Sequence, residues 1–312
     1  MISWLARSGR WMLPGGLVIG LVSPTLAEAL RPIIGPVVVI LLFLAVLRIG
    51  PEGLRIGRSG LMHAGLRALV LQLALPLAVA LPLAAAGLLQ GGFALGAVLF
   101  LCAAPLTGAA HFAVMAGGDP APALRQTVIG TALLPLTVVP IFAVVPAFGG
   151  ASEVIGAVFR LLLIIALAGG VALWLRSRGM VQATPRTFVR IDALAAVLLA
   201  VVVIGIMSAV GRTLREDPES FWLAMALVCA IGFGLQALAV LVLRDGPDLP
   251  ALAVIAGNRN VALFLGVLPA AVTDDLLLMI GCFQVPMYLT PLLLPRLIAL
   301  RRRRAGPGAG AN

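Results

Sequence analysis

The sequence predicts an all-α membrane protein built from ten transmembrane helices. Of its 312 residues, 62% are apolar and only 11% are charged, whereas soluble domains carry about 25% charged residues. The apolar runs are long and continuous, which excludes a membrane β-barrel, whose strands alternate apolar and polar residues. The polar remainder is too short for a second, water-soluble domain. We therefore expect residues 1–312 to form a single integral unit in the lipid bilayer.

Ten apolar runs are long enough to be transmembrane spans. A hydrocarbon core of about 30 Å takes about 20 helical residues. The runs are 12–30, 33–47, 65–88, 92–116, 122–148, 154–175, 191–210, 220–243, 249–272 and 276–298. The first run resembles a signal peptide, because Arg7 and Arg10 precede it and Ala27, Glu28 and Ala29 end it. Residues 14–16 interrupt its apolar core, so we expect the span to be retained.

The basic residues orient the spans. All of them are arginines, and the net charge of +10 would suggest nucleic acid in a soluble protein. Here the arginines lie mainly between apolar runs, which predicts membrane topology and no nucleic-acid partner. With a cytoplasmic N-terminus, sixteen arginines fall in inner segments and three, Arg31, Arg212 and Arg215, in outer ones. This predicts both termini on the cytoplasmic side of the plasma (inner) membrane, with a basic, glycine-rich tail at 299–312.

The ten spans divide into two sets of five. The division falls at about residues 149–151, giving repeats at 1–148 and 152–298. An odd number of spans per set means that the second set enters the membrane from the opposite side. The fourth span of each set carries a polar interruption, which is typical of transporters built as inverted repeats.

The interruption in the fourth span begins at a proline. Pro105 removes a backbone donor and is followed by Thr107 and Gly108, so the sequence predicts an unwound segment at membrane depth. His111 lies just beyond it. Histidine exchanges protons near neutral pH, but a lone histidine in an apolar span is as often a packing residue. Both readings of His111 remain open.

The interruption in the ninth span carries a charge. Asn258, Arg259 and Asn260 follow Gly257, about ten residues from either end of the span, which places Arg259 at a depth of about 15 Å. No acidic residue lies near the middle of a predicted span. We expect its partners to be helix C-terminal carbonyls, polar side chains, water or an anionic substrate. Intramembrane charges usually serve transport, although a structural arginine that joins broken helices is the alternative.

Three further polar residues are candidates for ion binding or coupling, together with His111. Thr127 and Thr131 are one helical turn apart in the fifth span and can present two hydroxyls to one point, or bond back to their own helix. Gln72 in the third span should face the interior of the bundle, because an amide is costly in lipid.

The sequence contains no pattern that predicts catalysis or a resident metal. Cys102, Cys229 and Cys282 lie inside apolar runs without paired spacing, so they predict neither a metal site nor a disulfide framework. No nucleotide-binding loop or hydrolase motif occurs. We therefore expect a transporter rather than an enzyme, and we infer no protein partner.

Several of these features resemble the bile acid:sodium symporter family. They are ten spans, the Pro105 break followed by residues 118–121 (Gly-Asp-Pro-Ala), a threonine-rich fifth span with Pro135 and Pro140, and the string AGNRNVA at 256–262. The resemblance covers essentially the whole chain. It implies a panel domain and a core domain, in which the discontinuous fourth and ninth helices cross.

The sequence departs from the family pattern at the positions that bind sodium. Ile255 stands at the position of a sodium-binding glutamate, Ala110 and His111 at those of a serine and an asparagine, and Arg259 at that of a glutamine. Asn260 is retained at a position that contacts substrate in the family. The resemblance with these departures implies transport without Na⁺, because Arg259 supplies a fixed positive charge. The alternative is one Na⁺ held by carbonyls around Gly257 and Asn258 with Thr127, Thr131 and Gln72.

The function we expect is secondary transport of a small organic anion by alternating access. The resemblance and the two breaks predict a substrate site formed by Arg259, Asn258, Asn260, Thr107, Gly108 and His111. Two alternatives keep the same architecture: an arsenite exporter that uses Cys102, and a proton-linked anion carrier that uses His111. A third, from another class, is a membrane sensor or scaffold that does not transport.

Overall fold

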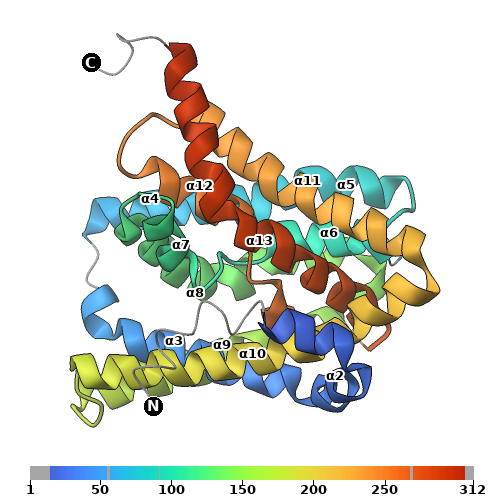
Figure 1. Cartoon of the computed structure of the whole chain (residues 1–312), viewed down its shortest axis with the longest axis horizontal. Coiled ribbons are helices and arrows are strands. Elements are labelled where there is room, and N and C mark those ends of the chain that lie inside the picture. The colour runs from blue at the N-terminus through green and yellow to red at the C-terminus, as the bar shows by residue number, and fades with distance from the viewer. Residues whose placement is uncertain (1–14, 55–56, 91, 268–269, 306–312) are drawn as a thin grey trace.

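The computed structural model describes residues 15–54, 57–90, 92–267 and 270–305, and these residues form an all-α structure (Figure 1). After a helical segment at 15–22, the helices in chain order are α2 (Pro24–Leu30), η1 (Arg31–Ile33), α3 (Ile34–Ile49), η2 (Pro51–Leu54), α4 (Arg58–Leu69), η3 (Val70–Ala74), α5 (Leu75–Ala85), α6 (Gly92–Cys102), α7 (Ala109–Met115), α8 (Pro120–Val144), η4 (Pro146–Phe148), α9 (Ala151–Ser177), α10 (Pro185–Glu216), α11 (Pro218–Val242), α12 (Leu249–Gly257), η5 (Val261–Gly266) and α13 (Ala270–Ala305).

Among the described residues, seven helical stretches are long and apolar enough to cross a membrane. They are Pro24–Ile49, Arg58–Ala85, Pro120–Val144, Ala151–Ser177, Pro185–Glu216, Pro218–Val242 and Leu276–Arg304. The prediction of a helical membrane protein is confirmed at this level. The predicted runs 92–116 and 249–272 are divided into shorter helices, and parts of the runs 12–30 and 33–47 share the continuous stretch Pro24–Ile49.

The chain reverses between the helical segment 15–22 and α2. Gly16 lies against Val203 of α10 and Gly20 against Met207, so segment 15–22 runs in the direction of α10. From Pro24 the chain runs the opposite way: Glu28 pairs with Arg212 at 3.1 Å, Ile34 lies beside Gly205, and Arg48 pairs with Asp192. The turn falls at Ser23, the one residue of 15–49 without helical structure.

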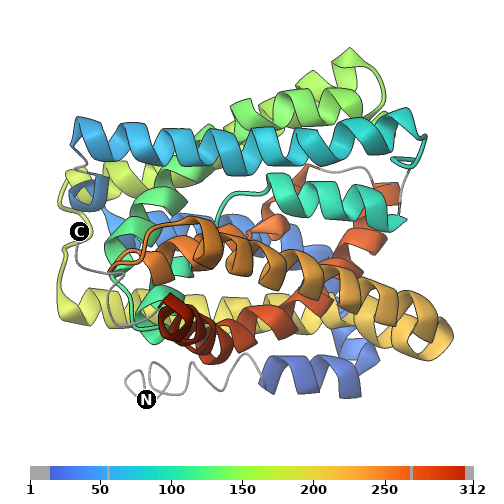
Figure 2. The same ribbon diagram turned by 90° about the horizontal axis from the view of Figure 1, so that it is seen from above.

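The helices pack as two groups. In the first group α3 packs against α9 and α10, and α2 packs against α10. The second group contains α4, α5, α6, α7, α8, α11, α12 and α13, and contacts of α10 with α13 and of α8 with α9 join the two groups. Figure 1 shows α3, α9 and α10 on one side of the molecule and α4, α7 and α12 on the other. In Figure 2, α4, η3 and α5 follow one another as a single long helix, which contains the π-helical segment Val70–Ala74.

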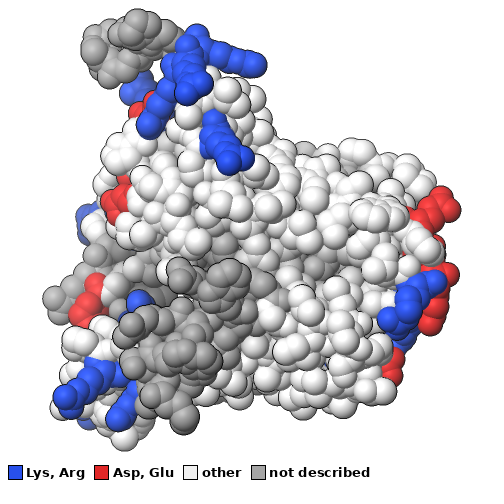
Figure 3. Space-filling view, in the orientation of Figure 1, with Lys and Arg blue, Asp and Glu red and all other residues white. Residues whose placement is uncertain are grey.

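Charged side chains lie at two ends of the molecule. Figure 3 shows them at opposite ends of one face, with an uncharged surface between. Ion pairs are found at both ends: Arg302 with Asp245 at 2.7 Å at one, and Arg212 with Glu28 at 3.1 Å at the other. Hydrogen bonds from the Arg302 guanidinium lower the pKa of the exposed Asp245 carboxyl. An uncharged belt between two charged ends is the surface expected of a protein that crosses a bilayer.

Candidate functional site

Two interruptions of helical structure pair with each other inside the molecule. The first lies between α6, which ends at Cys102, and α7, which begins at Ala109; the second lies between α12 and η5. The backbone N–H of Leu106 donates to the carbonyl of Asn258 at 3.0 Å, and that of Asn260 donates to Ala104 at 2.7 Å. Pro105 and Arg259 form the antiparallel bridge between these bonds. The pairing satisfies backbone groups that broken helices would leave without partners.

Arg259 is buried at this junction, with 1% of its surface exposed. Its Nε donates to the carbonyl of Ala256 at 3.0 Å, its Nη1 to that of Ala103 at 3.2 Å, and its Nη2 to that of Leu71 at 3.5 Å. Among the described side chains, no aspartate or glutamate is buried. The positive charge is therefore stabilised by backbone carbonyls, two of which lie at the negative C-terminal ends of α6 and α12.

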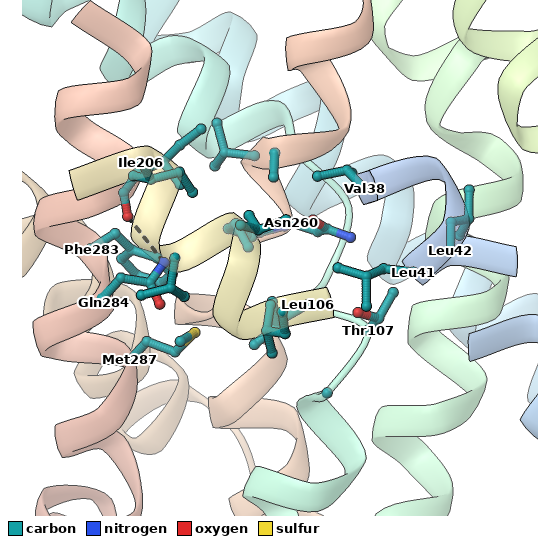
Figure 4. A pocket seen from close by; sticks show the side chains of 18 of the residues that line it. Val38, Leu41, Leu42, Leu106, Thr107, Ile206, Asn260, Phe283, Gln284 and Met287 are labelled. Atoms are coloured by element: carbon teal, nitrogen blue, oxygen red, sulfur yellow. Dashed lines mark hydrogen bonds between the residues drawn. The ribbon is translucent and has the colours of Figure 1, made fainter. Parts of the chain in front are cut away.

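A cavity of about 140 Å³ lies beside the paired breaks, between the two groups of helices. Its walls are mainly apolar, with Thr107, Asn260 and Gln284 as polar exceptions and Arg259 at its border. In Figure 4, Leu41 and Thr107 lie on one side of the cavity, Gln284 on the other, and Asn260 between them. The remaining lining residues are Val38, Leu42, Leu106, Gly108, Phe112, Leu199, Val202, Val203, Ile206, Val261, Ala262, Ile280, Phe283 and Met287.

A second, more open hollow of about 540 Å³ shares three elements with this cavity. It is bordered by Val39 of α3, Leu265 of η5 and Leu277 of α13, and the cavity is lined by neighbouring residues of the same elements. Glu28 and Arg31 also border it. The two hollows therefore follow one another along α3, η5 and α13.

Asn258 does not line the cavity. Its side-chain nitrogen donates to the Thr290 hydroxyl at 3.4 Å, and Gln236 Nε2 donates to the same hydroxyl at 2.9 Å. All three side chains are buried. Together they join the second break to α11 and α13. Gln236 and Thr290 were not predicted from the sequence, where the available signal was a polar side chain inside an apolar span.

Of the predicted coupling residues, Gln72 and Thr127 lie at the first break, and Thr131 lies one turn further along α8. Thr127 donates to the carbonyls of Ala123 at 2.9 Å and Leu106 at 3.3 Å, so it bonds back to its own helix and also reaches the break. Gln72 and Thr131 are buried, and neither side chain has a hydrogen-bond partner in the structure described. A Cβ on Gly130 would lie 2.7 Å from Nε2 of Gln72 and 2.9 Å from Cδ of Pro105, which places Gln72 against the break.

Two residues named in the sequence analysis lie away from the cavity. His111 is exposed on α7 and is not part of the cavity wall. Cys102 is buried, and its Sγ points back into α6, donating to the carbonyl of Leu99 at 3.4 Å. Neither arrangement adds support to the proton-linked or the arsenite alternative.

Within the described part of the chain, no group of three or more histidine, cysteine, aspartate or glutamate residues could hold a metal ion. No protein-family model and no curated protein matches the chain. The function must therefore be argued from the site itself.

The contacts of Asn258 predict a role in stability. We expect Asn258→Ala and Thr290→Val each to lower the free energy of unfolding by about 1–3 kcal/mol, because each leaves buried polar groups without partners. Thermal unfolding of the purified variants in detergent measures the loss. Melting temperatures equal to that of the wild-type protein would contradict this role.

Proposed function

We propose that the protein is a secondary transporter of a small organic anion, which binds in the cavity beside the paired breaks. The observation that carries the proposal is the buried Arg259 at the cavity border, with no buried carboxylate in the described structure to neutralise it. A fixed positive charge in a low-dielectric interior makes a neighbouring cavity favourable for an anion. Intramembrane charges of this kind usually lie on substrate pathways.

The lining of the cavity supports a particular kind of anion. Thr107 and Asn260 offer polar contacts on the side of the breaks, and most of the wall is aliphatic or aromatic. The volume of about 140 Å³ is smaller than the pockets of about 300–1,000 Å³ that hold drug-sized ligands. These features favour a small carboxylate or sulfonate with a short apolar tail.

The proposed architecture is that of an alternating-access carrier with ten spans. In this proposal segment 15–22, before the reversal at Ser23, belongs to the first span and Pro24–Ile49 is the second, and each pair of helices around a break supplies one more. In this proposal α2, α3, α9 and α10 are the panel, the second group of helices is the core, and the two halves form an inverted repeat. The two successive hollows along α3, η5 and α13 support a route between these groups.

The proposed topology predicts opposite sides for two exposed loops. In a background without Cys102, Cys229 and Cys282, Gln90→Cys should react with an impermeant maleimide from outside the cell, and Gln182→Cys only after the membrane is opened. Arginine distribution gives the reason, since it places both termini in the cytoplasm. Labelling of both positions from the same side would contradict the inverted repeat.

The transport proposal is tested by counterflow in proteoliposomes. Vesicles containing the purified protein are loaded with one unlabelled anion, and entry of the labelled anion is followed for a panel of carboxylates and sulfonates of different chain lengths. We expect exchange of at least one small anion with an apolar tail. Vesicles with Ala262→Trp, which places an indole ring in the cavity wall, serve as the matched control. Absence of exchange for every anion in the panel would contradict the proposal.

A further inference from the structure

Three backbone carbonyls, each at an interruption of a different helix, accept hydrogen bonds from the guanidinium of Arg259. Ala103 follows the last residue of α6, Ala256 lies in the last turn of α12, and Leu71 lies in the π-helical segment η3. Their oxygens accept from three different nitrogens of Arg259, at 3.2, 3.0 and 3.5 Å respectively. All three interruptions therefore converge on the guanidinium.

Carbonyls of this origin are the ligands that membrane carriers offer to sodium. Unwound backbone and helix C-terminal ends coordinate small cations at membrane depth, because their oxygens carry partial negative charge. A guanidinium can occupy such a site, since it has five N–H donors and no acceptor. In this chain the cation at the carbonyl site is the guanidinium of Arg259, which is part of the protein.

The residues at the site do not fit a dissociable sodium ion in addition. The guanidinium already takes the three carbonyls, and its charge would repel a second cation only a few ångströms away. The carbonyl of Asn258 accepts from the N–H of Leu106, and Thr127 donates to two carbonyls. Of the ligands considered for sodium from the sequence, the buried side chains of Gln72 and Thr131 remain without partners.

We propose that Arg259 is the permanently bound cation of this carrier. Its guanidinium fills the carbonyl site at the helix breaks, so transport needs no exchangeable cation, and removing the side chain creates a site that accepts one. This inference rests on the proposed transport function for its first part, but cation binding by the vacated site can be measured without transport.

The position of Gln72 supports the second part of the proposal. It follows Leu71, whose carbonyl binds the guanidinium, and its amide packs against Gly130 beside Pro105. In Arg259→Ala, two buried carbonyls and the part-buried carbonyl of Leu71 would lose the guanidinium as a donor, and the unpartnered oxygen of Gln72 lies in the same region. Buried oxygens without donors are costly, so a cation that they coordinate would lower the free energy of the folded variant.

The experiment measures thermal unfolding of the purified, detergent-solubilised Arg259→Ala protein. Guanidinium chloride, sodium chloride and choline chloride are added at equal millimolar concentrations. We expect guanidinium or sodium, but not choline, to raise the melting temperature of Arg259→Ala, because a ligand that binds only the folded state stabilises it. The wild-type protein and Arg160→Ala, which removes an exposed arginine from α9, should show no such difference between the salts.

Uptake by wild-type proteoliposomes provides the second measurement. Replacing external sodium with choline at fixed pH should leave the initial rate unchanged, and this test does not depend on the folding of any variant. A steep loss of rate, or equal responses of Arg259→Ala and wild type to guanidinium and sodium, would overturn the inference. A wild-type protein that carries no anion would instead count against the proposed function, while the melting curves still report on the cation site.

Discussion

Replacing Arg259 with alanine is expected to reduce anion uptake by about tenfold to a hundredfold in choline medium. The change removes the buried charge at the cavity border and three hydrogen bonds to carbonyls of the helix breaks. One charge-assisted interaction with the bound anion is worth about 1.5–3 kcal/mol, and every 1.4 kcal/mol corresponds to a tenfold change in affinity. Initial rates in proteoliposomes, normalised to folded protein from size-exclusion chromatography, measure the effect.

Arg160→Ala is the matched control for this prediction. It removes the same side chain from an exposed position on α9, so uptake should remain near the wild-type rate. Equal uptake by Arg259→Ala and the wild type would contradict the assigned role of the buried charge. An Arg259→Ala protein that fails to insert and fold would favour the structural alternative, in which the arginine only joins the broken helices.

Replacing Gly257 with alanine is expected to destabilise the folded protein. Gly257 is the last residue of α12, and a Cβ there would collide with the backbone carbonyl of Gly232 and approach Cγ of Gln236 to 2.6 Å. Overpacking in a core typically costs about 1–3 kcal/mol, and a backbone oxygen cannot rotate away as a side chain can. The yield of monodisperse protein and its melting temperature measure the loss.

Gly234→Ala is the control, and we expect it to raise the stability of the protein rather than lower it. Gly234 lies on the exposed face of α11 with open space around its Cα, so alanine should stabilise the helix by about 0.8–1.0 kcal/mol. If Gly257→Ala were as stable as Gly234→Ala, the close approach of α11 and α12 beside the second break would be wrong.

The positions of the two breaks could be predicted from sequence because proline, glycine and charged residues interrupt otherwise apolar runs. Pro105 with Gly108, and Gly257 with Arg259, are local signals of this kind. Where the side chains point depends on the three-dimensional packing. Asn258 and Asn260 are two residues apart, yet the first faces Thr290 and the second lines the cavity.

The partners of Arg259 could be predicted only as a class. Helix C-terminal carbonyls were one of four predicted kinds of partner. The carbonyl of Leu71 can accept from Arg259 because η3 adopts a π-helical turn. No residue in the run Val70–Ala74 predicts that turn. The reversal at Ser23 falls inside the predicted apolar run 12–30 and was not predicted. His111 could not be placed, because residues on a short helix face every direction around its axis.

The most direct test of anion binding at the paired breaks is equilibrium binding of a labelled anion, identified by counterflow, to wild-type protein and Ala262→Trp. Ala262 lines the cavity and is partly exposed, so an indole ring there fills the space without entering the packed core. We predict saturable binding to the wild type, no measurable binding to Ala262→Trp, and similar melting temperatures for both. Equal affinity of the two proteins for the anion would contradict the assignment of this cavity as the substrate site.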